Sequence, residues 1–395
     1  MRINVLTPWY PDKSLGRTYN GIFVERQVEA LENIGFRVSV EVPRLYRHPE
    51  RIVPDDIKDC LSKLAFQDPS KVFRRQNNSV SIPTLVPLRA TMAEKAESIS
   101  EALALKRSTE RFHADINHVH VALPIAPSIL EISETPLVIT EHSSHVRHEC
   151  QIPEVAEMYK ASISSSKAFI CVSRFLQQEI SDILGLEIDS SWKVVPNIVD
   201  FSEFHYRHRR EYLCKSWVYV GALLESKGVV NLLKTFKHFK SNHDNGARLT
   251  LVGSGPLEKW IKRFCLKNKI NDSVTIKEPV SQKSLAAVFS TMDLMVHLSP
   301  YETFGIVSLE AIASGLPVVS IKNGGSENTW EDLSDISGLV LDPSSTPKAI
   351  SKAIQEWRSG GIKVDLKDAS EILRKRFSSE VIANHLKEIY EEVLS

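Results

Sequence analysis

Residues 294–320 read LMVHLSPYETFGIVSLEAIASGLPVVS, and this stretch carries the clearest structural signals of the chain. Residues 294–297 form a short apolar run that is typical of a buried strand. A loop with Glu302 follows, and the apolar spacing then predicts a helix over 305–313 and a second strand over 317–320. A strand, a helix and a strand in this order indicate a βαβ unit with parallel strands.

The same alternation continues on both sides of this unit. Strands are predicted at residues 3–7, 36–42, 116–121, 136–140, 168–172 and 193–195, and again at 216–220, 248–252 and 274–276. Helices are predicted at residues 21–34, 93–111, 227–239, 256–264 and 281–289, whereas residues 43–90 show no clear period. Strands separated by segments of helix length indicate the α/β class with parallel sheets.

A polar and charged stretch at residues 200–212 interrupts the alternation and predicts a linker. We therefore expect one α/β domain over residues 1–200 and a second over 201–375, followed by a closing segment, 376–395, that is an amphipathic helix over 376–394. Ligands of such sheets bind at the carboxyl ends of the strands. With two such domains, the cleft between them is the expected site.

Composition narrows the class of protein. The 395 residues include 49 Lys and Arg and 49 Asp and Glu, so the formal net charge is +0, which argues against a general nucleic-acid binder. Five scattered cysteines without a C-x-x-C pair suit a reducing compartment. The chain has no apolar run of the roughly 18 residues that a membrane-spanning helix needs. We expect a cytoplasmic protein, with peripheral contact at the inner face of the membrane as an open alternative.

Two glutamates flank the start of the helix predicted over 305–313. Glu302 lies in the loop before it and Glu310 lies inside it. The first amides of a helix are unpaired donors at the positive end of its dipole, which suits a diphosphate. A carboxylate inside the helix can accept hydrogen bonds from a diol. The alternative is that both glutamates are ordinary solvated side chains.

Several motifs together resemble the retaining glycosyltransferases of family 4, which have the GT-B fold of two Rossmann-like domains facing across a cleft. The central motif is Glu302-x7-Glu310 with the following Gly-Leu-Pro-Val-Val and Gly-Gly-Ser-Glu runs. Further matching segments lie at residues 20–24, 140–143, 172–174, 195–197, 220–228 and 252–256. The resemblance spans nearly the whole chain in the order and spacing of the family. It implies an N-terminal acceptor domain and a C-terminal domain for a nucleotide-sugar donor. It also implies that the C-terminal helix of segment 376–395 crosses back onto the N-terminal domain.

The resemblance assigns a role to individual residues. Glu302 would contact the hexose, Glu310 the ribose hydroxyls and Lys227 the donor diphosphate, and His142 would lie beside the donor sugar. Glu141 could instead help to position the acceptor. The catalytic residues are thus predicted to be His142, Glu302 and Lys227. The predicted donor-binding residues are Gly21, Arg174, Lys227, Glu302, Phe304, Gly305, Ile306, Val307 and Glu310, of which 304–307 would offer backbone amides.

One position departs from the family pattern. The family commonly has Arg directly after the glycine that ends the strand at 216–220, and this chain has Ala222. Half of the usual cationic clamp is therefore missing there, and Arg174 or another basic residue is the suggested replacement. Gly253-Ser254-Gly255 is a weak phosphate-loop signal, and we favour a structural role for it.

These observations predict a retaining transferase that moves a hexose or N-acetylhexosamine from a nucleoside diphosphate sugar, with a UDP-sugar favoured, to an acceptor hydroxyl. Expected acceptors are a glycan, a glycolipid or another molecule of bacterial surface polysaccharide or glycoconjugate synthesis. No cofactor and no metal are expected, because helix termini and Lys227 can stabilise the leaving diphosphate. Alternatives are a nucleotide-sugar 2-epimerase with the same fold and a non-catalytic binder of sugar nucleotides.

Residues 43–113 are expected to shape the acceptor site. They contain scattered basic residues at positions 44, 47, 51, 71, 74, 75, 106, 107 and 111. These could contact an anionic lipid headgroup or a pyrophosphate acceptor, which would bring the N-terminal domain to the membrane. The alternative is ordinary solvated charge.

Overall fold

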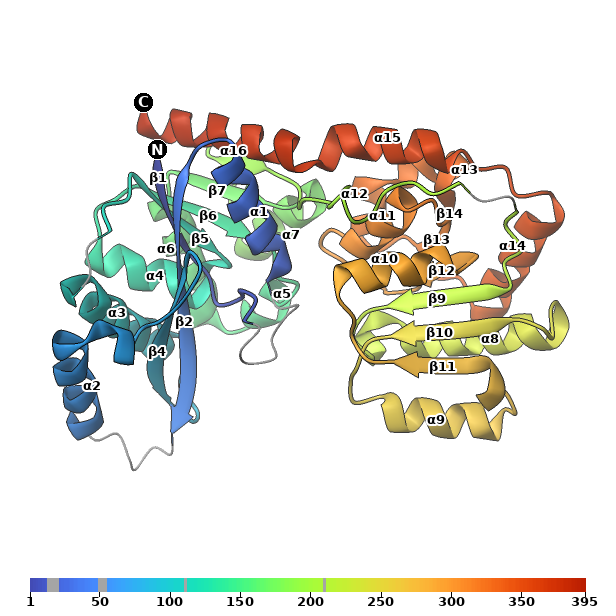
Figure 1. Cartoon of the computed structure of the whole chain (residues 1–395), viewed down its shortest axis with the longest axis horizontal. Coiled ribbons are helices and arrows are strands. Elements are labelled where there is room, and N and C mark those ends of the chain that lie inside the picture. The colour runs from blue at the N-terminus through green and yellow to red at the C-terminus, as the bar shows by residue number, and fades with distance from the viewer. Residues whose placement is uncertain (13–20, 49–54, 110–111, 209–210) are drawn as a thin grey trace. The chain divides into compact units, whose positions relative to one another are not determined.

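A computed structural model describes residues 1–12, 21–48, 55–109, 112–208 and 211–395. The chain forms two compact units, one made of Met1–Pro196 with Ser379–Ser395 and the other of Asn197–Ser378. Each unit is built on its own sheet with helices packed against it (Figure 1). The predicted class, two Rossmann-like α/β domains with parallel sheets, is confirmed.

The first unit contains an eight-stranded sheet in the order β3-β4-β2-β1-β5-β6-β7-β8. Neighbouring strands pair in parallel except at one edge, where β3 runs antiparallel to β4. The strands are β1 (Arg2–Leu6), β2 (Arg37–His48), β3 (Arg74–Gln76), β4 (Ser79–Pro87), β5 (Ile116–His120), β6 (Leu137–Glu141), β7 (Ala168–Cys171) and β8 (Trp192–Val194). Strands β1, β5, β6 and β7 are buried along nearly their whole length, as expected for parallel strands covered on both faces.

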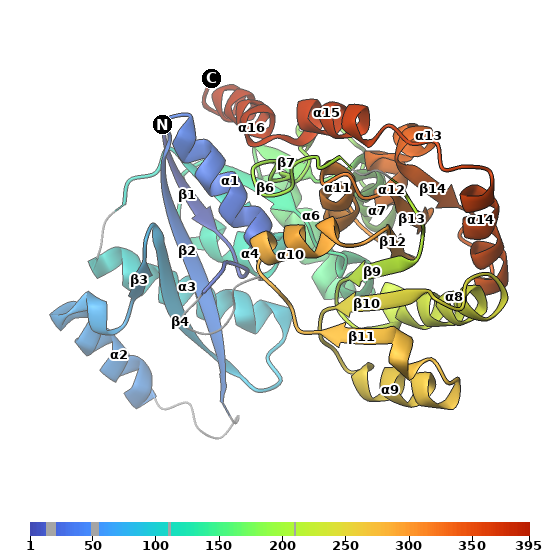
Figure 2. The same ribbon diagram turned by 45° about the vertical axis from the view of Figure 1, so that its right-hand side comes forward.

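Helices cover this first sheet. They are α1 (Ile22–Asn33), α2 (Asp55–Gln67), α3 (Met92–Thr109), α4 (Ala122–Ile132), α5 (Val146–Glu149), α6 (Pro153–Ser165), α7 (Arg174–Leu184) and α16 (Ser379–Leu394). The first and last helices, α1 and α16, pack side by side (Figures 1 and 2). The C-terminal segment is therefore part of the same core as the first strand.

The second unit contains a fully parallel six-stranded sheet in the order β11-β10-β9-β12-β13-β14. Its strands are β9 (Ser216–Val220), β10 (Arg248–Val252), β11 (Val274–Lys277), β12 (Leu294–His297), β13 (Val318–Ile321) and β14 (Gly338–Leu341). Its helices are α8 (Val229–Asn242), α9 (Glu258–Lys267), α10 (Gln282–Ser290), α11 (Ile306–Ala313), α12 (Gly325–Thr329), α13 (Ser334–Ser337), α14 (Pro347–Ser359) and α15 (Leu366–Phe377). The chain passes from β9 to β10 and β11 on one side, then returns to place β12 on the other side of β9.

An aromatic cluster anchors α8 to the first strand of this sheet. The Trp217 ring of β9 lies 5.5 Å from the ring of Phe236 and 4.9 Å from that of Phe239, and all three side chains are fully buried. Burying a side chain of this size stabilises the fold by about 1.5–3 kcal/mol. This packing fixes the helix that follows the loop 221–228, and thereby fixes the loop at the carboxyl end of β9.

Residues 43–90, for which no period was recognised, are regular in the structure. Strand β2 extends to His48, α2 occupies Asp55–Gln67, and β4 pairs with β2 along its whole length. Every second residue of β4 is buried, from Val80 to Val86. The prolines at positions 83 and 87 and the polar Thr84 obscure this alternation in the sequence, because proline normally marks the end of a strand.

The predicted closing helix over 376–394 is present as α16, which begins at Ser379 in place of Arg376. Residues 366–377 form α15 in the second unit, and α16 begins at Ser379 in the first. Ser378 between them has extended backbone angles, φ −69° and ψ 157°. Strand β14 and helices α14 and α15, between residues 338 and 377, were not predicted.

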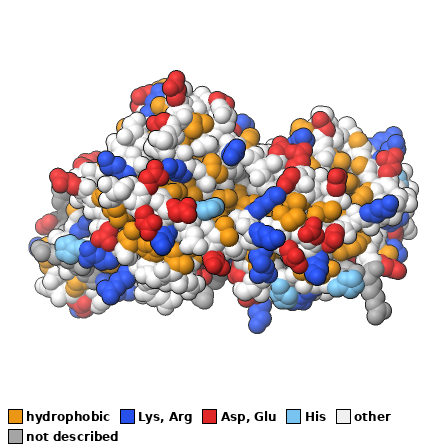
Figure 3. Space-filling model, turned by 90° about the horizontal axis from the view of Figure 1, so that it is seen from above, with side chains coloured by type: hydrophobic (Ala, Val, Ile, Leu, Met, Phe, Trp, Pro, Cys, Tyr) orange, Lys and Arg blue, Asp and Glu red, His pale blue; other side chains and the backbone are white. Residues whose placement is uncertain are grey.

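The surface carries both signs of charge. Lys and Arg side chains are interspersed with Asp and Glu side chains over the face drawn in Figure 3, in keeping with a formal net charge of +0. Within the described ranges, none of the helices has the length and apolar character needed to cross a bilayer.

Candidate functional site

The central motif lies at the carboxyl ends of strands β9, β12 and β13 of the second unit. The strand order reverses between β9 and β12, and such a switch point is where open parallel sheets leave a crevice for a ligand. Three loops meet there: the segment 221–228 after β9, the segment 298–305 after β12, and the segment 322–324 after β13. The structure thereby brings Lys227 and Glu302 together, although they lie 75 residues apart.

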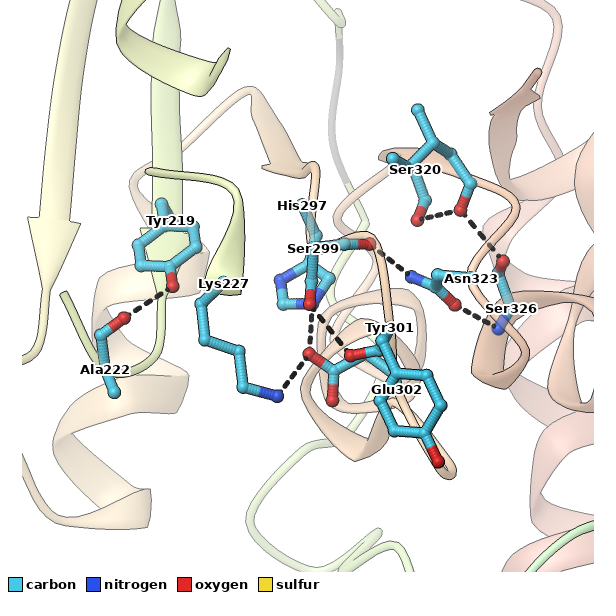
Figure 4. A network of polar contacts seen from close by, with 11 residues as sticks. Tyr219, Ala222, Lys227, His297, Ser299, Tyr301, Glu302, Ser320, Asn323 and Ser326 are labelled. Atoms are coloured by element: carbon cyan, nitrogen blue, oxygen red, sulfur yellow. Dashed lines mark hydrogen bonds and ion pairs between the residues drawn. The ribbon is translucent and has the colours of Figure 1, made fainter. Parts of the chain in front are cut away.

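The side chain of Glu302 binds two partners through one oxygen. Nζ of Lys227 donates to Oε1 of Glu302 over 2.9 Å, and Nε2 of His297 lies 3.2 Å from the same oxygen (Figure 4). The Glu302 side chain is 16% exposed and that of Lys227 is 28% exposed. The pair is therefore partly sheltered from water and open on one side.

The Glu302 carboxyl group is ionised at neutral pH. Burial acts to raise its pKa, but the hydrogen bond and charge of His297 and those of Lys227 outweigh burial and lower the pKa to about 2. An ionised carboxylate only accepts hydrogen bonds. Glu302 is thus equipped to receive hydroxyl donors and not to give a proton.

A glycine places Lys227 against the loop after β12. Lys227 ends the turn η3 (Glu225–Lys227), and Gly228 follows it with φ +72°. A Cβ atom at residue 228 would lie 1.9 Å from the carbonyl oxygen of Leu298, so only glycine permits this approach. Because the backbones of Gly228 and Leu298 lie so close, the Lys227 ammonium group reaches Glu302.

The loop that carries Glu302 is braced by the loop after β13. The Glu302 amide donates to the carbonyl oxygen of Asn323 over 2.8 Å, and the Asn323 side-chain amide donates to the carbonyl oxygen of Ser299 over 3.2 Å. Oδ1 of Asn323 in turn accepts from the Ser326 amide over 2.9 Å (Figure 4). These bonds hold the acidic side chain on a fixed backbone.

Glu327, the last residue of the Gly-Gly-Ser-Glu run, stabilises the local backbone through hydrogen bonds. Its Oε2 accepts from the amides of Asn323 and Gly324 over 2.7 and 2.9 Å and from Oγ of Ser326 over 2.8 Å. Burial acts to raise the pKa of Glu327, but these hydrogen bonds outweigh it and lower the pKa. The bonds fix the turn that supports Asn323.

Helix α11 begins directly beside Glu302. Gly305 precedes it, and Ile306 and Val307 are its first residues, all three half-buried. The first amides of a helix lack partners inside the helix and carry the positive end of its dipole. Phe304 points inward, with its ring packed edge-on at 5.6 Å against that of Phe377. Its predicted role uses the backbone amide, which this packing holds in place.

Glu310 lies within α11 and is buried, with 5% of its surface exposed. It is the fifth residue of the helix, whereas Glu302 precedes the helix by four residues. The Glu302 carboxyl group therefore lies before the start of α11, and the Glu310 carboxyl group lies on the helix itself. This separation agrees with different predicted partners for them.

Three predicted site residues, Gly21, His142 and Arg174, lie in the first unit. Gly21 caps α1 with φ +76°, and a Cβ there would lie 1.9 Å from the carbonyl oxygen of Trp9. His142 follows β6, and its ring lies 4.4 Å from the ring of Phe23, two residues after Gly21, with 37° between the two ring planes. The structure thus brings Gly21 and His142 to the same region of the first unit.

The prediction that Glu141 helps to position an acceptor is wrong. Its side chain is fully buried and accepts hydrogen bonds from the amides of Ala122, His142 and Ser143 over 3.0, 2.9 and 2.7 Å. Burial raises the pKa of Glu141 to about 7, against the lowering effect of these bonds. Glu141 therefore holds the backbone of His142 and Ser143 and the start of α4.

Two family models match the chain. The model "Glycosyltransferase Family 4" matches residues 21–203, and the model "Glycosyl transferases group 1" matches residues 215–376. The chain belongs to glycosyltransferase family 4. It is therefore an enzyme of the glycosyltransferase class, and the sequence-based recognition of the family is confirmed.

Similar proteins agree with this membership. The chain is 25% identical to the putative teichuronic acid biosynthesis glycosyltransferase TuaC of Bacillus subtilis (strain 168) over 374 residues, which covers 90% of this chain and 89% of the relative. Among solved structures, sucrose-phosphate synthase from Thermosynechococcus elongatus matches with a TM-score of 0.73 and 19% identity, covering 100% and 99% of the two chains. Alr3699/HepE of Anabaena in complex with UDP and glucose matches with a TM-score of 0.64 and 14% identity, covering 99% and 100%. These structures confirm the GT-B fold.

Ala222 and Arg174, the two positions considered for the second cation, belong to different units. Ala222 stands in the second unit where the family commonly has Arg, and its carbonyl oxygen accepts from the Tyr219 hydroxyl over 2.9 Å. Arg174, suggested as its replacement, is an exposed residue at the start of α7 in the first unit. Among the residues that the structure describes, no group of three or more His, Cys, Asp or Glu side chains is placed to hold a metal ion.

Sequence reasoning missed His297 and Asn323. His297 is the last residue of β12, five residues before Glu302, and a polar residue ending an otherwise apolar strand was an available signal. Asn323 acts mainly through its backbone carbonyl and its amide group, which no spacing rule reveals. Gly253 and Gly255 have the structural role favoured for them, because a Cβ at either position would meet the backbone of Gly221 or Leu223.

Proposed function

We propose that this enzyme transfers a hexose or N-acetylhexosamine from a nucleoside diphosphate sugar, with UDP as the favoured carrier, to an acceptor hydroxyl with retention of anomeric configuration. The observation that carries the proposal is the Lys227–Glu302 pair beside the start of α11, at the switch point of a parallel sheet. A cation, a helix N terminus and an ionised carboxylate are the groups that a diphosphate bound to a sugar requires.

The roles follow from the chemistry of these groups. The Lys227 ammonium and the first amides of α11 neutralise the diphosphate as it leaves. Oε2 of Glu302 accepts a hexose hydroxyl while Oε1 stays bound to His297, and Glu310 accepts the ribose hydroxyls. His142, in the first unit, contacts the transferred sugar. These assignments need no metal for charge neutralisation, so we expect turnover to be unchanged in EDTA.

All bonds made and broken in the transfer step, and the proton that moves, belong to the two substrates. The bond between the anomeric carbon and the diphosphate oxygen breaks, and the bond to the acceptor oxygen forms on the same face. The proton of the acceptor hydroxyl passes to the leaving diphosphate. The protein contributes position and charge stabilisation, which in enzymes of this kind supply most of the rate enhancement.

The biological setting is proposed from the relatives. The name of TuaC places that protein in teichuronic acid biosynthesis, and HepE was solved with UDP and glucose. By analogy we propose a role in the synthesis of a bacterial surface polysaccharide or glycoconjugate. We propose that the basic residues of the first unit, such as Arg47 and Arg75, bring it to an anionic acceptor at the inner face of the membrane.

A donor panel tests the proposal. We expect one nucleoside diphosphate sugar, at 100 times its dissociation constant, to stabilise the protein by about 2.7 kcal/mol in a thermal-shift assay. That donor should then be consumed with acceptor present, with an unchanged anomeric configuration in the product by NMR. Release of a 2-epimerised sugar without acceptor would instead indicate an epimerase. Binding without turnover under any acceptor would indicate a non-catalytic binder.

A further inference from the structure

Two neighbouring strands of the first unit carry a row of polar side chains on one face of the sheet. His118 and His120 lie in β5, and His120 pairs in register with Thr140 of β6. Alternate residues of a strand share a face, so Thr140 is followed on that face by His142. All four side chains are buried, with between 0% and 7% of each residue exposed. The catalytic histidine of the proposed function is therefore the outermost member of a buried row.

The His142 ring contacts two other rings, those of His120 and Phe23. Nε2 of His142 lies 2.9 Å from Nδ1 of His120, and the two rings stack at 5.2 Å with an angle of 22° between their planes. The Phe23 ring also lies near, with its centroid 4.4 Å from that of His142. A hydrogen bond and a ring contact together fix the rotation of an imidazole that neither would fix alone.

The bond between the two histidines also determines where their protons lie. Burial lowers the pKa of His120 well below its ordinary value, and the neighbouring His118 and His142 lower it further. The facing nitrogens of His120 and His142 share one proton, so the tautomer of the neutral His120 ring determines whether Nε2 of His142 donates or accepts this bond. A change at residue 120 thus alters both the orientation and the hydrogen-bonding pattern of His142.

We infer that His120 is a positioning residue for sugar transfer. Through its own Nδ1 atom, His120 fixes the ring orientation and the tautomer of His142. This inference rests on the proposed function, in which His142 contacts the transferred sugar. His120 itself is 1% exposed and touches no substrate in this account.

The remaining members of the row support the fold at a greater distance from His142. Nδ1 of His118 lies 2.6 Å from the Tyr390 hydroxyl of α16, and Nε2 of His118 lies 2.7 Å from Oγ1 of Thr140. The Tyr390 hydroxyl is therefore a matched control. It belongs to the same buried network, and its removal leaves the bond between His120 and His142 intact.

The test compares His120→Leu, His120→Asn and Tyr390→Phe in steady-state kinetics with the donor identified in the panel. Asn places an oxygen or nitrogen near the position of Nδ1, whereas Leu removes it. We expect His120→Leu to lower kcat by about 10- to 100-fold with little change in KM for the donor. His120→Asn should recover most of kcat. Tyr390→Phe should lower the melting temperature and leave kcat within about twofold of wild type.

The outcomes separate this inference from the proposed function. If His142→Ala abolishes transfer and His120→Leu does not slow it, the positioning role is wrong and the proposed function stands. Full activity of His142→Ala would remove His142 from the proposed site. Equal losses of kcat in His120→Leu and Tyr390→Phe would show a structural effect only. If His120→Leu does not fold, His120→Gln replaces it, because Gln carries its amide one carbon farther out, and equal kcat for Gln and Asn would also overturn the inference.

Discussion

Lys227 bonds to Glu302 in this structure and has a second partner in the proposed function. Its ammonium lies 2.9 Å from Glu302, and a bound diphosphate would compete for it. We predict that Lys227→Ala weakens UDP binding roughly 10- to 150-fold, the loss expected for about 1.5–3 kcal/mol. Uridine affinity should change little, and titration calorimetry measures both. Lys322→Ala is the control, because this lysine pairs with Glu331 at the same end of the sheet. Equal weakening of UDP and uridine would remove Lys227 from the phosphate site.

His297 and Lys227 together lower the pKa of Glu302, and the Tyr219 ring of β9 stacks on the His297 ring at 5.9 Å. His297→Leu removes a hydrogen bond and a charge that hold the Glu302 pKa near 2, so the pKa should rise toward 4.5. We predict that the acid limb of kcat/KM moves to higher pH in His297→Leu. His297→Gln, whose amide can replace Nε2, should show a smaller shift.

The lowered pKa of Glu302 also predicts how the free energy of unfolding depends on pH. A carboxyl group with a lowered pKa in the folded state stabilises the fold above its unfolded pKa, near 4.5 for Glu302. This stability is lost as the pH falls from about 4.5 through about 2. The loss measured by denaturant titration should be smaller in His297→Leu than in wild type. An identical acid limb and identical acid destabilisation in the two proteins would contradict the assignment.

The sequence predicts the residues proposed to contact the donor, but it does not predict the residues that hold them in position. Lys227 and Glu302 were named from a family motif, and the structure places them 2.9 Å apart. His297, Asn323 and His120 act through contacts between loops and strands that are distant in sequence, and such contacts have no periodic signature. Glu141 was misjudged because a glutamate at a strand end looks accessible in sequence, whereas this one is fully buried.

A substitution at Gly228 tests whether the close approach of segment 221–228 to Leu298 positions Lys227. Alanine there would adopt φ +72° at a cost of about 1–2 kcal/mol and would also collide with the Leu298 carbonyl oxygen. Gly361→Ala is the control, because it has φ +74° with no atom within 4 Å of a new Cβ. Each kcal/mol lowers the melting temperature by about 2–4 °C. We predict a larger decrease for Gly228→Ala than for Gly361→Ala, and weaker UDP binding only for Gly228→Ala. Equal effects would show that the close approach does not matter.

Elements with continuous apolar runs were predicted well from sequence. Strands β9, β10 and β12 have the bounds expected for them, because each is buried in the middle of a parallel sheet. Strand β4 was missed because it has prolines and alternating burial. The break at Ser378 was missed because the helical pattern continues across it, and the division of the chain into two units separates α15 from α16.

At the scale of the whole molecule, the donor should affect one unit far more than the other. We predict that UDP at 100 times its dissociation constant slows hydrogen exchange by up to about 100-fold in residues 221–228 and 302–308 of the second unit. Strands β2 and β4 of the first unit should exchange at unchanged rates. Hydrogen-exchange mass spectrometry of the full chain measures both sets of peptides. Protection confined to the first unit would place the nucleotide elsewhere.

The two glutamates give the most direct measurement of the central claim. Glu302→Ala and Glu310→Ala are compared with wild type in UDP titrations and in turnover of the donor sugar, after equal melting temperatures without ligand have excluded misfolding. We predict that Glu302→Ala loses turnover and does not weaken UDP binding, because the sugar is the only part of the donor that Glu302 contacts, and its removal leaves Lys227 available to the diphosphate. Glu310→Ala should weaken UDP roughly 10- to 150-fold through the ribose hydroxyls. Full transfer activity in Glu302→Ala, or unchanged UDP affinity in Glu310→Ala, would contradict this account of the site.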